Sequence, residues 1–256
     1  MVLPAAGLGS RFREAGELRP KPLIPVFDIP MIIWVLLNFP LVATDKVWII
    51  SQKKDSVPSA LEGILSFLSI DIEFVEIDGL TEGPASTVAI VLKKLNDNEA
   101  LIVANTDQFV FSNLSPFVEM VREGHSQGQI LTMLASSDAW SYVGRDSSGR
   151  INRVAEKVEI SNEATVGIYG WSKVSDAKDA FKDTFANNIR TNHEFYVAPT
   201  YNFMISQGLV IEAWQVGNHG EAVHGLGIPS DLISFLNHPK AQGFALEIKS
   251  LVGYYF

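Results

Sequence analysis

The segment Met1-Val-Leu-Pro-Ala-Ala-Gly-Leu-Gly-Ser-Arg-Phe12, followed shortly by Arg19-Pro-Lys-Pro-Leu-Ile-Pro25, decides how this chain folds at its start. A short apolar run breaks there into a turn that contains two glycines. We expect Gly7 and Gly9 to take positive φ values, so that the backbone can approach a ligand with its amide hydrogens pointing into the concavity. A turn of this kind cradles phosphate groups.

Two cations accompany the glycine turn. Arg11 lies two positions after Gly9, and Lys21 stands between two prolines that favour an extended segment aiming its side chain. Two cations held beside such a turn suit a nucleoside triphosphate. The alternative that the residues leave open is an ordinary strand-to-helix turn with two solvated surface charges.

Two common phosphate-binding motifs are disfavoured by the same segment. A dinucleotide-binding fingerprint needs a third glycine where Phe12 stands. A Walker A loop needs the sequence Gly-Lys-Ser/Thr, which the segment lacks.

The opening segment resembles that of the sugar-1-phosphate nucleotidyltransferases, a family that includes the glucose-1-phosphate thymidylyltransferases. That family opens with L-A-A-G-x-G-x-R followed by K-P and a hydrophobic residue, and this chain reads Pro4-Ala-Ala-Gly-Leu-Gly-Ser-Arg11 and Lys21-Pro-Leu23. The resemblance implies a Rossmann-like, GT-A-like α/β fold. It also implies which residues act: Ala6, Gly7 and Gly9 on the nucleotide, and Arg11 and Lys21 as catalytic cations on its phosphates.

Composition sets outer bounds on the protein. The 256 residues are 47% hydrophobic, which is enough for a substantial core, and α/β proteins of this length are often one domain. The net charge of −9 makes nucleic acid an unlikely partner. The absence of cysteine excludes disulfides, thiolate metal sites and a cysteine nucleophile. Asp28 and three prolines interrupt the apolar stretch 23–43, and no secretion signal is recognisable, so we expect no membrane partner and a cytoplasmic protein.

Alternating strand and helix patterns predict an α/β fold with a mostly parallel, mixed central sheet flanked by helices. We divide one nucleotidyltransferase domain, 1–256, into a nucleotide-binding half 1–125, an acceptor-binding half 126–238 and a tail 239–256. The apolar end 251–256 is expected to dock on the body or on a second subunit, so a homo-oligomer is possible. The expected strands are 47–51, 72–77, 100–104, 129–135, 151–158 and 164–171, and the expected helices are 30–39, 56–68, 84–95, 176–185 and 194–206.

Asp107 follows the buried strand 100–104 with no cation adjacent in sequence. Ligands of open α/β sheets bind beyond the carboxyl ends of the strands, and a carboxylate there suits a hard divalent ion. We therefore expect Asp107 to be the catalytic ligand of Mg²⁺, which is also the role that the resemblance implies. The alternative is an aspartate that only forms a turn.

Further segments fit the family pattern. Glu82 and Gly83 precede a helix and resemble the turn that meets the nucleobase, although a plain helix start would look the same. Glu156 and Lys157 resemble the family's Glu-Lys-Pro segment, which contacts the acceptor. On an alternating strand their side chains would point to opposite faces. The alternative is a pair of exposed strand residues without a ligand. Acceptor contacts are likewise expected from three residues: Gly167, Glu194 and Tyr196.

One segment departs from the family pattern. Where the family often reads W-x-D-I-G-T-P-E-D-L, this chain reads Val223-His-Gly-Leu-Gly-Ile-Pro-Ser-Asp-Leu232, so Gly225 stands in place of an aspartate that completes the metal site. Either one carboxylate suffices, with phosphate oxygens and water, or His224 or Glu221 contributes. Asp231 is expected near a helix start, where its charge favours the helix dipole.

These observations predict attack of an acceptor phosphate on the α-phosphorus of a nucleoside triphosphate, with pyrophosphate as the leaving group. The family resemblance implies a sugar 1-phosphate or a related phosphate as the acceptor. Segment 193–202 resembles that of members from bacterial surface-polysaccharide biosynthesis, some of which activate phosphorylated compounds that are not sugars, so the identity of the acceptor stays open. Two alternatives remain. One is a nucleotide-sensing module without turnover, and the other is a nucleotide-sugar glycosyltransferase, for which the chain offers only half of an Asp-x-Asp motif.

Overall fold

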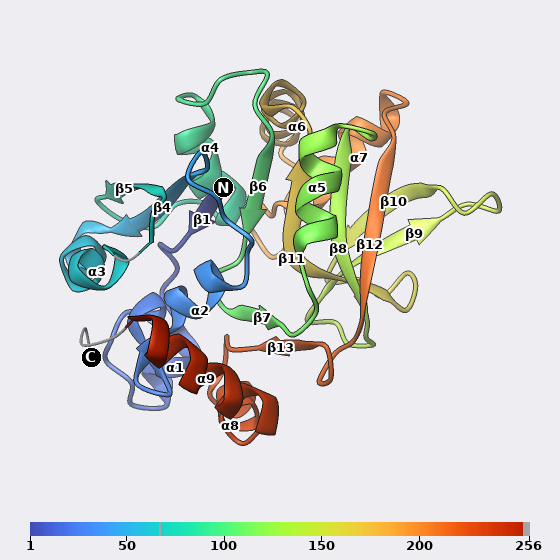
Figure 1. Cartoon of the computed structure of the whole chain (residues 1–256). Coiled ribbons are helices and arrows are strands. Elements are labelled where there is room, and N and C mark those ends of the chain that lie inside the picture. Colours follow the sequence, from blue (N-terminus) through green and yellow to red (C-terminus); the bar gives the residue numbers. More distant parts are fainter. Residues whose placement is uncertain (67, 253–256) are drawn as a thin grey trace.

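The computed structural model describes residues 1–66 and 68–252, and within them a nine-stranded sheet runs through the molecule (Figure 1). Strands β6, β1, β4 and β5 are parallel, whereas β11 runs antiparallel to both β6 and β8. The expected α/β fold with a mixed sheet is confirmed. The spatial order is β10 (Ile151–Glu156), β9 (Ser141–Arg145), β11 (Glu163–Trp171), β6 (Leu101–Ala104), β1 (Val2–Pro4), β4 (Lys46–Gln52) and β5 (Asp71–Ile77), with β8 (Gly128–Leu134) and β12 (Ile211–Asn218) branching from β11.

Helices cover both faces of the sheet because its central strands are apolar on both sides. In β4, Val47 and Ile49 join one buried cluster, while Trp48 and Ile50 join the other. The first cluster includes α2 (Met31–Leu37), α3 (Val57–Leu65), α5 (Ser115–Glu123), α8 (Pro229–Leu236) and α9 (Pro239–Val252), and the second includes α4 (Pro84–Leu92), α6 (Val174–Ala186) and α7 (Tyr201–Ser206).

Short elements complete the description. A ribbon of β7 (Gln108–Val110) and β13 (Val223–Gly225) leads into α8, and a second ribbon pairs β2 (Pro25–Val26) with β3 (Ile29–Pro30). The remaining short turns of helix are α1 (Ser10–Glu14), η1 (Lys21–Leu23), η2 (Lys53–Asp55) and η3 (Ala198–Thr200).

Most expected elements are present, and the main differences lie at their ends. The predicted helix 194–206 is wrong over its first residues, because Phe195 pairs through its backbone with another segment: its N–H donates to Glu82 O at 2.8 Å, and its carbonyl accepts from Ala85 N at 3.0 Å. The predicted strand 151–158 ends at Glu156, since Lys157 has φ +57°. The expected docking of 251–256 concerns side chains outside the described residues.

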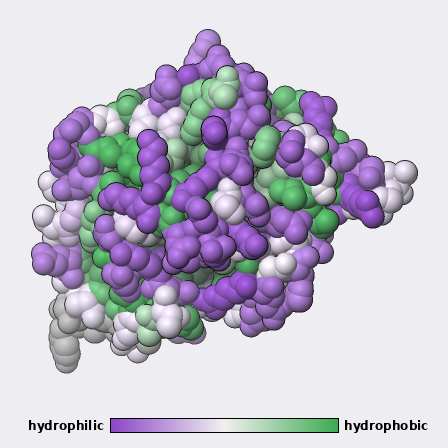
Figure 2. All heavy atoms as spheres, turned by 90° about the horizontal axis from the view of Figure 1, so that it is seen from above, coloured by the Kyte–Doolittle hydropathy of each residue, from purple (hydrophilic) through white to green (hydrophobic). Residues whose placement is uncertain are grey.

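Seen from above the view of Figure 1, the surface is mostly hydrophilic, and its apolar side chains lie in separate patches (Figure 2). Over the described stretches 1–66 and 68–252, no helix combines the length and apolar character that crossing a bilayer requires.

Candidate active site

The candidate site lies at the carboxyl ends of the parallel strands. Because β1, β4 and β6 run in the same direction, the loops that follow them meet at one edge of the sheet. The side-chain amide of Gln52, at the end of β4, donates to the carbonyl of Ala6 at 2.6 Å. This bond fixes the glycine loop against the sheet.

The glycine loop lines a cavity of about 470 Å³. Gly9 has φ +59°, as expected for the residue before α1. The expectation of a positive φ is wrong for Gly7, where a Cβ would meet no atom within 4 Å. Residues from five segments line the cavity, among them Ala6, Gly7, Gly9, Lys21, Thr81, Gly83, Asn105, Asp107, Glu194 and Tyr196.

Gly83 allows two backbones to meet at the wall of this cavity. It has φ +123°, and a Cβ there would lie 2.6 Å from the carbonyl oxygen of Phe195. The expectation for Glu82 differs from the structure. Its side chain is exposed and pairs with Arg190 at 3.2 Å, outside the cavity that Gly83 lines.

Lys21 and Asp107 meet at the centre of the site. The Lys21 ammonium donates to Asp107 Oδ2, and each side chain is about one-fifth exposed, 20% and 22% respectively. No cation is adjacent to Asp107 in the sequence, but the fold brings Lys21 to it from 86 positions away. Lys21 also begins the turn η1 rather than an extended segment. Arg11 lies exposed on α1 and lines the neighbouring cavity.

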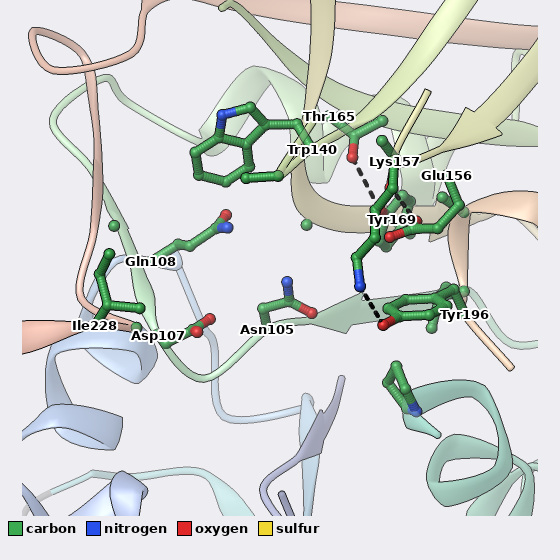
Figure 3. A pocket seen from close by; sticks show the side chains of 18 of the residues that line it. Asn105, Asp107, Gln108, Trp140, Glu156, Lys157, Thr165, Tyr169, Tyr196 and Ile228 are labelled. Carbon is green, nitrogen blue, oxygen red and sulfur yellow. Dashed lines mark hydrogen bonds between the residues drawn. The ribbon is translucent and has the colours of Figure 1, made fainter. Parts of the chain in front are cut away.

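The second cavity, of about 280 Å³, adjoins the first. The two cavities share Lys21, Pro84, Asn105, Asp107 and Tyr196, which form the seam between them. Figure 3 shows Asn105 in the middle of this seam, with Asp107 and Gln108 on one side and Lys157 and Tyr196 on the other. The expected acceptor residues Glu156, Lys157 and Gly167 all line this second cavity.

Glu156 and Lys157 face the same cavity, so the expectation of opposite faces is wrong. The left-handed conformation of Lys157 turns its side chain back beside that of Glu156. Lys157 Nζ donates to the hydroxyl of Tyr196 at 2.5 Å, and this hydroxyl donates to Glu194 Oε2 at 2.7 Å. These contacts join Lys157 and Tyr196 to Glu194. Glu194 was also expected to contact the acceptor, but it lines the glycine-loop cavity and not the second one.

Burial raises the pKa of two groups that line the second cavity, Glu156 and Tyr196. Glu156 is 9% exposed, and its burial raises the pKa of its carboxyl, although a hydrogen bond donated by Ser141 Oγ opposes the rise. Burial also raises the pKa of Tyr196, and its hydrogen bond to Glu194 raises it further. Tyr196 is therefore a neutral donor at ordinary pH.

Gly167 makes room for two amides that the sequence reasoning did not single out. It lies at the bulge of β11 with φ +81°, where a Cβ would collide with the side-chain amide of Asn105 and lie 3.2 Å from Gln108 Oε1. Gln108 Oε1 is buried and has no hydrogen-bond partner among the described residues. Asn105 could have been found from its place beside Asp107 after the strand. Trp140, which also lines the cavity, is brought there by tertiary structure alone.

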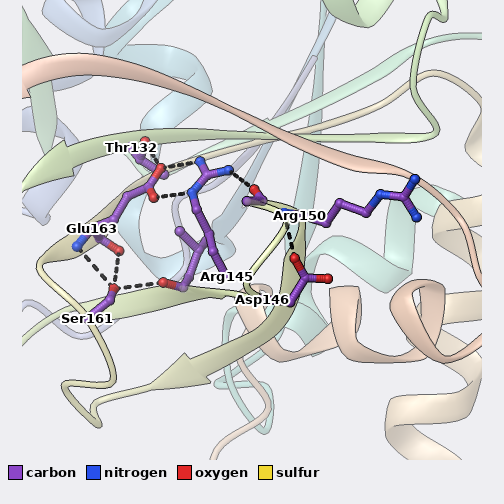
Figure 4. Close-up of polar contacts among 8 residues, drawn as sticks. Thr132, Arg145, Asp146, Arg150, Ser161 and Glu163 are labelled. Carbon is purple, nitrogen blue, oxygen red and sulfur yellow. Dashed lines mark hydrogen bonds and ion pairs between the residues drawn. The ribbon is translucent and has the colours of Figure 1, made fainter.

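A charged contact holds the hairpin that carries Ser141 and Glu156 (Figure 4). Arg145 donates to Glu163 from Nε at 2.7 Å and from Nη2 at 2.8 Å, and Thr132 Oγ1 donates to the same carboxylate at 3.0 Å. The contact pins β9 to β11 at the end away from the cavity.

Residues 1–193 match the family model described as nucleotidyl transferase. The chain belongs to this family. The matched range contains the glycine loop, Lys21, Asp107, Glu156 and Lys157, whereas the segment around Gly225 and Asp231 lies beyond it.

Individual relatives agree with the family assignment. The chain is 29% identical over 178 residues to a mannose-1-phosphate guanyltransferase from Emericella nidulans; the match covers 66% of this chain and 48% of that protein. The chain thus spans about half the length of this curated relative.

Two solved structures show the same fold. One is the nucleoside-diphosphate-sugar pyrophosphorylase from Vibrio cholerae RC9, with TM-score 0.78, 24% identity and coverage of 93% of this chain and 99% of that one. The other is the inositol-1-phosphate CTP transferase from T. maritima, with TM-score 0.72, 14% identity and coverage of 97% and 94%.

Proposed function

We propose that this protein transfers a nucleoside monophosphate from a nucleoside triphosphate to the phosphate group of a small-molecule acceptor, a sugar 1-phosphate or a related phosphate, with release of pyrophosphate. One observation carries the proposal: two adjoining cavities share a seam at which Lys21 and Asp107 meet. Membership of the nucleotidyl transferase family supports the same reaction.

The two cavities differ in what they offer a ligand. The cavity at the glycine loop presents backbone groups and Lys21, which suits a base and a polyphosphate. The other cavity presents a carboxylate, a neutral phenol, amides and the indole of Trp140, which suit a hydroxylated acceptor, while Lys157 supplies a cation for its phosphate. The reacting phosphates would then meet at the seam.

The reaction needs no nucleophilic side chain. An oxygen of the acceptor phosphate forms a bond to the α-phosphorus, the bond between that phosphorus and the bridging oxygen to the β-phosphorus breaks, and pyrophosphate leaves with the electron pair. Lys21, and Arg11 at the edge of the second cavity, would neutralise charge on the phosphates. Alignment of the two substrates would supply much of the remaining rate enhancement.

The donor chemistry of the seam fits Mg²⁺. Asp107 offers hard oxygens, and one of them already faces a cation, the Lys21 ammonium. No group of three or more His, Cys, Asp or Glu side chains gathers as a metal site in the described chain. Substrate phosphates and water would complete the shell of an ion held at Asp107. When bound, the ion would neutralise charge on the triphosphate, and Asp107 would hold it there.

Pyrophosphate release tests the proposal. The purified protein would be incubated with Mg²⁺, each of CTP, UTP, dTTP, GTP and ATP, and a panel of phosphorylated acceptors. We expect pyrophosphate to form only when a triphosphate and an acceptor are both present. Release of a nucleoside diphosphate would indicate a glycosyltransferase instead. Binding without any turnover over the panel would indicate a sensing module.

The setting of this reaction belongs to the same proposal. Resemblance to polysaccharide-biosynthesis members supports a role in supplying activated intermediates for surface polysaccharides, in the cytoplasm where nucleoside triphosphates are made. We also infer that the protein can form a homo-oligomer. Light scattering coupled to size-exclusion chromatography would test this inference.

A further inference from the structure

The loop between β13 and α8 places two glycines against two carboxylates. A Cβ on Gly225 would lie 2.9 Å from Asp231 Oδ2. A Cβ on Gly227 would collide with Asp107 Oδ2 and lie 3.4 Å from the Lys21 nitrogen. Each carboxylate thus enters space that a side chain on the loop would fill.

The β7/β13 ribbon brings Gly225 close to Asp107. Gly225 stands directly opposite Gln108 in the antiparallel pairing, and Gln108 is the next residue after Asp107. Opposed Cα atoms in such a ribbon are about 4.5–5.5 Å apart. The N–H of Leu226 also donates to the carbonyl oxygen of Asp107 at 2.7 Å. A carboxylate carried by position 225 would therefore neighbour that of Asp107, and the carboxylate of Asp231 reaches this same space from α8.

The side chain of Asp231 makes few contacts that would stabilise the fold. It sits in the first turn of α8, where no side chain caps the helix by a hydrogen bond. Its carboxylate accepts a hydrogen bond from Ser230 Oγ at 3.4 Å, and no ion pair within residues 1–66 and 68–252 includes it. Its side chain lines the acceptor-side cavity together with Asp107.

We propose that Asp231 is the second protein carboxylate of the divalent-cation site, in place of the acid that position 225 lacks. This inference rests on the proposed function. Mg²⁺ is commonly held by one or two carboxylates plus substrate phosphates and water, so Asp107 and Asp231 form a sufficient protein contribution. Asp231 would supply this carboxylate from α8, because its Oδ2 lies 2.9 Å from the place of a Cβ on Gly225.

Metal binding without turnover tests the inference. Mn²⁺ is titrated into the protein, alone and with inorganic tripolyphosphate, and free Mn²⁺ is followed by electron paramagnetic resonance. We expect Asp231→Asn to weaken Mn²⁺ binding by at least about tenfold, since even indirect partners of a metal contribute that much. Glu62→Gln removes the same charge from the exposed side of α3, outside both cavities, and should leave the affinity unchanged.

A swap variant tests the position of the carboxylate. Gly225→Asp combined with Asp231→Ala returns the acid to the strand and should restore most of the lost Mn²⁺ affinity. A folded swap variant that stays as weak as Asp231→Asn would overturn the inference. Unchanged Mn²⁺ binding in Asp231→Asn, with only a raised KM for the acceptor, would also overturn it and assign Asp231 to the acceptor. Pyrophosphate release by the unaltered protein is measured separately, so failure of this inference leaves the proposed function standing.

Discussion

If the proposed function holds, the ion pair of Lys21 and Asp107 marks the place of the reaction. Their charged groups meet where two cavities join, so a substrate phosphate arriving from either side encounters the same cation. The Lys21 ammonium contacts Asp107 Oδ2, and Asp107 is also the residue that would hold a metal ion. Nucleotide binding would therefore exchange a carboxylate partner for a phosphate partner at Lys21.

Replacement of Lys21 tests its part in the chemistry. We expect Lys21→Ala to lower kcat for pyrophosphate release by at least about a hundredfold, because removal of one preorganised charge partner commonly costs that much. Its thermal unfolding should change little, since partly exposed ion pairs contribute about 0–1 kcal/mol. Unchanged turnover in the folded variant would remove Lys21 from the mechanism.

The burial of Glu156 predicts a pH dependence of stability. Its folded-state pKa is raised above 4.5, so the native state binds the proton more tightly than the unfolded chain does. Its contribution to stability is therefore present at low pH and is lost as pH rises through the folded pKa. Glu156→Gln should gain in melting temperature relative to the unaltered protein as pH rises from about 4 to 7.

The matched control for Glu156 is Glu159, an exposed carboxylate that accepts a hydrogen bond from Ser136 Oγ at 2.8 Å. For Glu159→Gln, the difference in melting temperature from the unaltered protein should change little with pH. An equally flat difference for Glu156→Gln would contradict the raised pKa. Turnover assays should also show a higher KM for the acceptor in Glu156→Gln, with nucleotide binding unchanged.

At the scale of elements, the bulge of β11 lines the acceptor-side cavity through Gly167. Gly167→Ala imposes a side chain on a left-handed residue, at a cost of about 1 kcal/mol, and it also displaces the amide of Asn105. We expect turnover to fall about tenfold or more, since small misplacements at a reacting centre are costly.

Gly149 provides the control for this strand variant. It has a similar φ, +84°, but an added Cβ would meet no atom within 4 Å. Gly149→Ala should lose a comparable free energy of unfolding in urea and keep its full activity. Equal activity in the two alanine variants would show that the space beside Asn105 does not matter.

The hairpin of β9 and β10 depends on the contact between Arg145 and Glu163. Glu163 has a side chain only 11% exposed, whereas that of Arg145 is 39% exposed, so the loss of Arg145 leaves a nearly buried carboxylate short of donors. We expect Arg145→Met to lower the free energy of unfolding in urea by about 1–3 kcal/mol. Arg150→Met on the same hairpin, where the side chain points away from this cluster in Figure 4, should change it by less than about 0.5 kcal/mol. Equal values would contradict the role given to this pair.

At the scale of the whole molecule, the last two helices are attached through an aromatic cluster. Phe111 and Phe235 pack around His224 and His238, whose ring centroids are 4.7 Å apart. Within the described chain, His224 Nε2 and His238 Nδ1 are buried without hydrogen-bond partners. Gly225, the last residue of β13, follows His224 directly, so this cluster also holds part of the site.

The cluster predicts a loss of stability in acid. Burial lowers the pKa of His224 below 6.5, and the nearby His238 lowers it further. The unfolded chain therefore binds the extra proton first, and stability falls as pH drops below about 6.5. His224→Phe should make the melting temperature less dependent on pH between about pH 6.5 and 5. The exposed His125→Phe should keep the slope of the unaltered protein, and an unchanged slope in His224→Phe would contradict the prediction.

The sequence by itself determined the features that depend on neighbours along the chain. Apolar runs predicted the buried strands, the glycine turn predicted a concave backbone segment that lines a cavity, and the position of Asp107 after a strand predicted its place at the sheet edge. These patterns are short-ranged, because hydrogen bonding and burial of a strand or turn are set by a few consecutive residues.

Only the tertiary structure decided which distant side chains meet. It paired Lys21 with Asp107, turned Lys157 beside Glu156 through one left-handed residue, and placed Asp231 over Gly225. No local pattern encodes these contacts, since each depends on the packing of elements far apart in the chain. Single residues indicated which chemistry the candidate site could support. The geometry of the site came from the sheet and the ribbons that bring these residues together.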